Sequence, residues 1–177
     1  MSAARSVTLE AMLAARDARV VRQNEALAAH PLPLISVTLV SPGPVKSGML
    51  PHRLMQAALA AIDATLSREH WPAIVRQVFW LPTGPEALYV VNADSHALKT
   101  ALIELENRHA LGRLWDLDVI TRDGSVGRGQ LGIAPRRCLL CDEAAHACAR
   151  SRRHSLPELT ARIEDMVDAF DRHDSAA

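Results

Sequence analysis

The sequence predicts an α+β domain in which two helices cover one face of an antiparallel, four-stranded sheet. Four short segments alternate apolar and polar residues, as half-buried strands do. Two longer segments carry leucine, isoleucine and alanine at helical spacing, and the order is strand, helix, strand, strand, helix, strand. This order is the split βαβ, or ferredoxin-like, pattern.

An N-terminal helix is expected before the sheet, over residues 8–29, with Thr8 as N-cap and Pro31 after its end. Its apolar residues near one face are Leu9, Leu13, Val20 and Leu27. A polar stripe lies on another face and consists of Arg16, Arg19 and Gln23, with Arg22 beside it. We interpret this stripe as solvated, with phosphate binding as the alternative.

The first strand is predicted at residues 34–40, where Ser36 and Thr38 face the side opposite to the apolar residues. A loop rich in proline and glycine follows and carries Lys46. The other predicted elements are a helix at 52–69, strands at 75–81 and 87–92, a helix at 95–109 capped by Ser95, and a strand at 114–121. Because the first and last strands are neighbours in this pattern, the Lys46 loop should lie close to residues 112–116.

We expect one domain over residues 1–177, with its core at about 32–122. The remainder is a segment rich in cysteine and arginine plus a helix, at about 135–172, where Ser155 and Glu158 form a capping box. The helix itself is predicted at 156–172.

The composition excludes several classes of partner. The 177 residues contain 20 basic and 20 acidic side chains, and only 3% are aromatic, which argues against a nucleic-acid-binding surface. No apolar stretch is long enough to span a bilayer, and no signal peptide is evident. Three cysteines clustered within eleven residues are not a disulfide framework, so we expect a cytoplasmic protein with no membrane partner.

Asp116 and Asp118 are the strongest candidates for chemistry. They lie two apart on a predicted strand and therefore share a face, beside Ser36 and Thr38 of the first strand. Two adjacent carboxylates repel each other, and Mg²⁺ bridging to phosphates is their natural partner. The alternative is a pair of solvated acids on an exposed strand.

Basic residues in several segments could converge on a polyphosphate, although each could also be an ordinary surface charge. The candidates are Arg19, Arg22, Lys46, Lys99, Arg113, Arg136 and Arg137. His109 and His154 are candidate general bases, for which the alternative is a capping or packing role.

Cys138 and Cys141 have the Cys-x₂-Cys spacing of a zinc knuckle. Cys148 and His154 could complete a structural Zn²⁺ site, with His146 as a substitute. The later spacing departs from common zinc fingers, so we favour three small buried thiols that pack against the sheet.

Several motifs taken together resemble the citrate lyase holo-acyl-carrier-protein synthase family, that is, apo-citrate lyase phosphoribosyl-dephospho-CoA transferases. The residues that carry the resemblance are Ala15–Gln23, Ser41–Lys46, His109–Val119, Arg136–Cys141 and Cys148–Ser155. The resemblance implies transfer of phosphoribosyl-dephospho-CoA from 2′-(5″-triphosphoribosyl)-3′-dephospho-CoA to a serine of the citrate lyase acyl carrier (γ) subunit, with release of diphosphate. We accordingly assign Asp116 and Asp118 to a Mg²⁺ ion, and Lys46, Arg113, Arg19 and Arg22 to the triphosphate.

Two alternatives to this function remain at the level of the sequence. One is the related transfer to another carrier protein, of the malonate decarboxylase type. The other is a non-enzymatic interaction module that binds zinc through Cys138, Cys141, Cys148 and His154.

Overall fold

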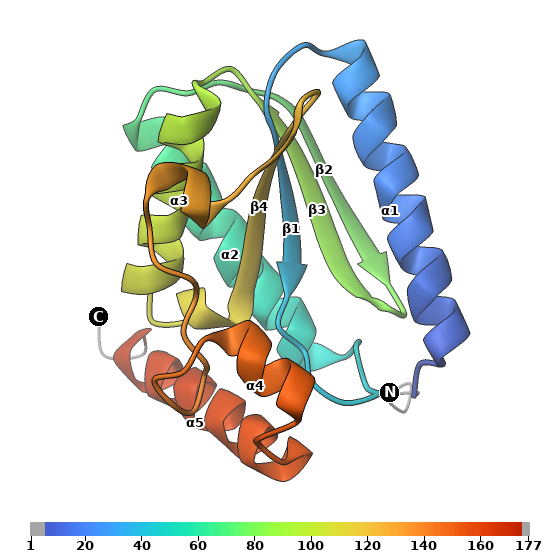
Figure 1. The fold of residues 1–177 in the computed structure, drawn as a ribbon, viewed down its shortest axis with the longest axis vertical. Helices are drawn as coiled ribbons and strands as arrows, with labels where there is room; N and C mark the ends of the chain where they lie inside the picture. The colour runs from blue at the N-terminus through green and yellow to red at the C-terminus, as the bar shows by residue number, and fades with distance from the viewer. Residues whose placement is uncertain (1–5, 175–177) are drawn as a thin grey trace.

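The computed structural model describes residues 6–174, which form an antiparallel sheet of five strands with helices on both faces (Figure 1). The strand order is β2-β3-β1-β4-β5. The strands are β1 (Leu34–Leu39), β2 (Ala73–Leu81), β3 (Gly84–Val91), β4 (Trp115–Thr121) and β5 (Gly124–Val126). The predicted α+β class and the antiparallel pairing of the first strand with the 114–121 strand are confirmed, whereas the predicted number of four strands is wrong.

Four of the five α-helices begin and end close to the predicted residues, and the short helix before the last one was not predicted. They are α1 (Leu9–Ala29), α2 (Met49–Arg68), α3 (Ser95–Arg108), α4 (Ala145–Ser151) and α5 (Leu156–Asp174), with short 3₁₀ helices η1 (Gly112–Leu114) and η2 (Arg128–Leu131). Thr8 caps α1 as expected, and Ser155 and Glu158 form the predicted capping box. The cap of α3 is Asp94 rather than Ser95, because its carboxylate accepts the hydrogen bonds of two first-turn amides. No helix within residues 6–174 has the length and apolar content needed to cross a membrane.

The main core lies between the sheet and helices α2 and α3. From β4, Trp115 and Leu117 point into this core and are fully buried, and from β1 so do Ile35 and Val37. Helix α5 adds Ile163 and Val167 to the same cluster. Since successive residues of a strand face opposite ways, this packing turns Asp116 and Asp118 to the other face of the sheet, as predicted.

Helix α1 covers part of that other face (Figure 1). Its polar side chains Arg22 and Gln23 contact the strands beneath it. Leu9 and Leu13 are 75% and 49% exposed, so the apolar face predicted for this helix packs only at its end, through Leu27. Gln23 instead donates a hydrogen bond of 2.9 Å to Ser36 Oγ of β1. The interpretation of the stripe as solvated is therefore wrong for Arg19, Arg22 and Gln23, because the sheet face beneath them carries polar groups that need hydrogen-bond partners. Arg16, in contrast, is exposed.

The additional strand β5 forms a hairpin with β4. Residues 122 and 123 connect the two strands, and Gly124, the first residue of β5, has a φ of 119°, a conformation that favours glycine. Only three residues of β5 pair with β4, which is too short for an alternating pattern to be recognised in the sequence.

Gly112 is required by close packing rather than by its φ angle. A Cβ atom at this position would lie 2.5 Å from the carbonyl oxygen of Leu105 and 2.6 Å from that of Glu106, both in the backbone of α3. We expect Gly112→Ala to lower the free energy of unfolding by about 3 kcal/mol, measured by urea denaturation. The control is Gly129→Ala, whose added Cβ has no atom within 4 Å and which should leave stability unchanged. Equal stability of the two variants would contradict this packing.

Candidate functional site

A cleft of about 230 Å³ opens where the end of β1, the loop after it, the β2–β3 turn and α1 meet. Its polar lining consists of Arg19, Thr38, Ser41, Lys46, Thr83, Glu86 and Asp116. The amide of Val40 donates a hydrogen bond of 2.9 Å to the carbonyl of Leu114, which holds the Lys46 loop against the start of β4. The predicted proximity of these two segments is confirmed, and three predicted site residues, from three distant parts of the chain, share one cleft.

Glu86 fixes Arg19 and Arg22, two of the three arginines of α1. It lies on β3, is 7% exposed, and accepts a hydrogen bond of 2.5 Å from the guanidinium of Arg22. Arg19 Nε lies 3.8 Å from the other carboxylate oxygen of Glu86. The guanidinium of Arg22 also stacks 4.5 Å above the ring of Phe79, so both cations are held in place before any ligand binds. Sequence reasoning missed Glu86, since its partners lie more than sixty residues earlier in the chain.

Lys46 makes a hydrogen bond within its own loop, the one that follows β1. Its ammonium donates a hydrogen bond to the carbonyl oxygen of Ser41 at the start of the same loop. Partial burial lowers the pKa of Lys46 from its usual value, because the charged form loses hydration. The side chain therefore presents a fixed, incompletely hydrated positive charge to the cleft.

Asp116 and Asp118 lie side by side on β4, opposite Thr38 and Ser36 of β1 in the pairing register. Their side chains are 53% and 58% exposed, and each has one cation nearby. Arg136 lies 3.6 Å from Asp116, and Lys99 lies 3.7 Å from Asp118. Burial raises the pKa of Asp118, the charge of Asp116 raises it further, and Lys99 acts in the opposite direction.

These two aspartates fit a Mg²⁺ ion. Mg²⁺ is held in proteins by one or two carboxylates together with waters and substrate phosphates. Asp116 and Asp118 offer oxygen ligands on one exposed face, beside a cleft that also contains cations suited to phosphate.

Several predicted phosphate-binding residues lie elsewhere. Lys99 is only 5% exposed, and its ammonium donates a hydrogen bond of 2.7 Å to the carbonyl of Leu117. The guanidinium of Arg113 binds the carbonyl oxygens of Arg137 and Cys138, and thereby anchors the C-terminal segment. Arg137 itself points to solvent and pairs with Asp142 at 3.3 Å. Among the predicted arginines outside α1, Arg136 alone forms an ion pair with one of the two aspartates within residues 6–174.

A buried ionic cluster completes the exposed edge of β4. The carboxylate of Glu106 accepts a hydrogen bond of 3.1 Å from the amide of Leu117 and another from the guanidinium of Arg128. Lys99 donates a hydrogen bond to the carbonyl of Leu117. Glu106 and Lys99, both on α3, therefore satisfy the backbone groups of Leu117 that β5 is too short to pair. Sequence reasoning missed this cluster, because Glu106 looks like one of several acidic residues on a helix.

His109 lies on the core side of the sheet, away from the two aspartates. Its ring packs against Trp115 and Phe170, with ring centroids 4.4 Å and 5.6 Å apart. Its Nδ1 accepts a hydrogen bond of 3.1 Å from the amide of Leu111, so this nitrogen must be unprotonated. This placement is that of a packing histidine, and we give it no part in the reaction proposed below.

The environment of His109 predicts a pH dependence of stability. Burial lowers the pKa of His109 below its usual value, so the unfolded chain binds more protons than the folded chain between these two values. Stability should therefore fall as the pH drops below about 6.5. In His109→Gln, whose side chain can still accept the Leu111 hydrogen bond, unfolding in urea at a series of pH values should show a smaller fall. An unchanged pH dependence in the variant would assign the acid sensitivity to another group.

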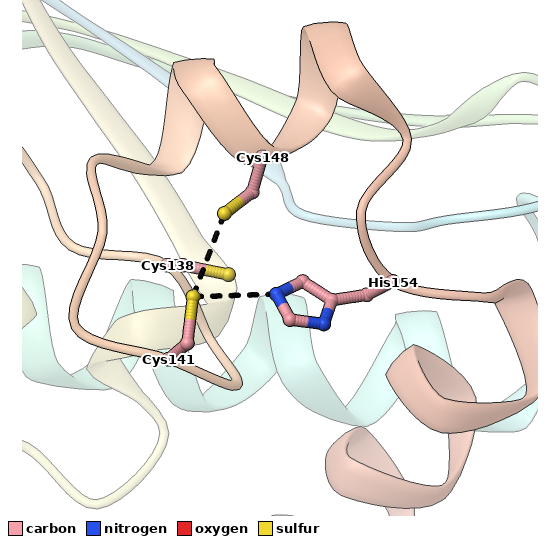
Figure 2. Close-up of side chains that lie close together, drawn as sticks. All are labelled: Cys138, Cys141, Cys148 and His154. Atoms are coloured by element: carbon pink, nitrogen blue, oxygen red, sulfur yellow. Dashed lines mark hydrogen bonds between the residues drawn. The ribbon is translucent and has the colours of Figure 1, made fainter.

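A second group of polar side chains comes together in the C-terminal segment. It consists of Cys138, Cys141, Cys148 and His154, whose ligand atoms all lie within 4.8 Å of one another (Figure 2). His146, considered as a substitute ligand, is exposed and does not belong to this group.

Comparison with known proteins identifies the family. Residues 7–170 match the family described as apo-citrate lyase phosphoribosyl-dephospho-CoA transferase. Proteins with that name from Escherichia coli O7:K1 (strain IAI39 / ExPEC) and Shigella boydii serotype 18 (strain CDC 3083-94 / BS512) are each 38% identical to this chain over 167 residues. Each alignment covers 94% of this chain and 91% of the relative. The chain belongs to the apo-citrate lyase phosphoribosyl-dephospho-CoA transferase family, and is thus a transferase rather than a non-enzymatic zinc module.

Proposed function

We propose that this protein transfers phosphoribosyl-dephospho-CoA from 2′-(5″-triphosphoribosyl)-3′-dephospho-CoA to a serine hydroxyl on the acyl carrier subunit of apo-citrate lyase. The serine oxygen forms a bond to the phosphorus nearest the ribose, the bond from that phosphorus to the next bridging oxygen breaks, and diphosphate leaves. The serine proton is released. The observation that carries this proposal, beside the family, is the cleft in which Arg19, Lys46 and Asp116 meet.

The charges around the cleft suit a triphosphate. Arg19, Lys46, Glu86 and Asp116 line the cleft. Arg22 and Arg136 lie behind it as partners of the two carboxylates, so the group as a whole has two formal positive charges in excess. Because Glu86 and the Ser41 carbonyl already hold three of these cations, little reorganisation is needed when the donor binds. In this proposal the cations bind and orient the triphosphate and stabilise charge on the departing diphosphate.

Asp116 and Asp118 would hold a Mg²⁺ ion beside the same phosphates. When bound, that ion supplies further positive charge at the phosphoryl oxygens. Arg136 and Lys99 hold the two carboxylates in position from either side.

The order β2-β3-β1-β4 with α2 and α3 on one face supports the further proposal that this part of the chain is a ferredoxin-like split βαβ unit.

The release of diphosphate tests the identity of the acceptor. We expect it to require both the donor and the apo acyl carrier subunit of citrate lyase, and to cease when the acceptor serine is replaced with alanine. The apo carrier protein of malonate decarboxylase is the comparison. If this second carrier supports release and the citrate lyase carrier does not, the proposed acceptor is wrong, although the donor chemistry stands.

A further inference from the structure

We propose that Cys138, Cys141, Cys148 and His154 form a structural Zn²⁺ site that fixes the C-terminal segment onto the transferase domain. This site is independent of the proposed substrates. Figure 2 shows the four side chains pointing toward one centre from a loop, from α4 and from the segment before α5. Within residues 6–174 no other set of three or more histidine, cysteine or acidic side chains converges in this way.

The distances between the ligand atoms agree with tetrahedral zinc. Zn–S bonds of about 2.3 Å and a Zn–N bond of about 2.0 Å place sulfur atoms about 3.8 Å apart and sulfur and nitrogen about 3.5 Å apart. The Cys141 and Cys148 sulfurs are 3.5 Å apart, and the Cys141 sulfur lies 3.3 Å from His154 Nε2. The ligands therefore need to move by only a few tenths of an ångström at these two edges.

The backbone around the site has the shape of a zinc knuckle. Residues 137 and 144 form an isolated antiparallel bridge, and the amide of Cys138 donates a hydrogen bond of 2.7 Å to the carbonyl of Glu143. The resulting tight hairpin presents Cys138 and Cys141. Helix α4 follows and supplies Cys148, after which Arg152, with a φ of 49°, turns the chain so that His154 returns to the cluster.

The chemistry of the ligand set favours zinc over the alternatives. Three thiols and one imidazole are soft or intermediate ligands, which select Zn²⁺ rather than Mg²⁺. A disulfide would use two sulfurs about 2.05 Å apart and would leave the third thiol and the imidazole with no reason to converge. All three cysteines are free in the structure, and Cys138 and Cys148 are buried.

The site has a structural consequence near the cleft. The Cys138 and Arg137 carbonyls accept hydrogen bonds from Arg113, and the neighbouring Arg136 binds the Arg113 carbonyl and lies 3.6 Å from Asp116. Residues 132–144 lie outside any helix or named strand, and Leu139 of this segment packs against the main core. Helix α5 reaches the main core by itself through Ile163 and Val167, so loss of the metal should loosen the segment without unfolding the domain.

Zinc content of the purified full-length protein tests the site. We expect about one zinc per chain in protein prepared with a thiol reductant, and replacement by Co²⁺ should give the intense visible bands of tetrahedral cobalt with a thiolate charge-transfer band. Cys141→Ser and His154→Ala should lose the metal. The matched control is His146→Ala, which removes an exposed histidine from the same segment and should retain it.

Measurements on the wild-type protein keep the test decisive if a ligand variant fails to fold. After removal of the metal with a chelator, hydrogen exchange should quicken in residues 136–155 and stay unchanged in β1, β3 and β4. The proposal is overturned if the reduced protein holds no zinc and gives no tetrahedral cobalt spectrum. It is equally overturned if both ligand variants keep their zinc, or if two of the cysteines are found in a disulfide in the protein as isolated under reductant.

Discussion

Asp116→Asn and Asp118→Asn should each lower the rate of transfer at least about 100-fold. Each substitution removes a negatively charged oxygen ligand of the proposed Mg²⁺ ion, which would stabilise charge on the phosphoryl oxygens. Asparagine has nearly the same shape as aspartate, and both side chains are more than half exposed. The fold and the thermal stability should therefore be retained. The rate is measured as mass gain of the carrier subunit over time at saturating donor and Mg²⁺.

The control for this pair is Asp123→Asn, which removes an exposed carboxylate from the β4–β5 turn of the same hairpin. It should transfer at the wild-type rate. Binding of the donor to the two variants, followed by calorimetry, separates a loss of chemistry from a loss of affinity. Transfer within a few-fold of wild type by both variants would remove Asp116 and Asp118 from the reaction and leave the cations of the cleft to be explained in another way.

Glu106→Ala should lower the free energy of unfolding by about 3–5 kcal/mol, the largest loss of stability that we expect from a single polar side chain here. Glu106 is 3% exposed and satisfies both the Leu117 amide and the Arg128 guanidinium. Its removal leaves a buried amide unpaired and a cation without its anion. A loss of this size is a large part of the total stability of a domain, so the variant should unfold at a much lower urea concentration.

Two comparisons identify the cause of that loss. Glu106→Gln keeps an oxygen that can accept from the Leu117 amide and should lose less stability than Glu106→Ala. Glu104→Ala removes an exposed acid from the same helix and should change stability by less than about 0.5 kcal/mol. If Glu106→Ala were as stable as Glu104→Ala, the ionic cluster would not support the edge of β4.

The parts of the fold predicted from the sequence are those in which local pattern and packing agree. The alternation of Trp115, Leu117 and Val119 with two aspartates identifies both the strand and the face that each residue takes, because one face must be buried. The same assumption, that the apolar face is the buried one, leads to the wrong orientation for α1. An amphipathic pattern places the apolar side inward, but here the sheet beneath carries Ser36 and Glu86 and selects the polar side.

The candidate site was predicted in part. Asp116, Lys46 and Arg19 could be chosen from the sequence because a carboxylate suits a metal ion and a cation suits a phosphate. The pairing of β1 with β4 brings Lys46 and Asp116 to the same cleft. Glu86 and Glu106 were missed because a carboxylate becomes informative only when its partners, far away in the sequence, are known. Lys99 illustrates the converse, since a lysine that resembles a phosphate ligand instead completes a strand edge.

The intact mass of the apo acyl carrier subunit of citrate lyase, after incubation with this protein, the triphosphoribosyl-dephospho-CoA donor and Mg²⁺, tests the central claim most directly. We predict a mass gain equal to the donor minus diphosphate, located on one serine and absent when Asp116→Asn replaces the wild-type protein. No gain, with an intact donor and a carrier shown to be in the apo form, would contradict the proposed reaction.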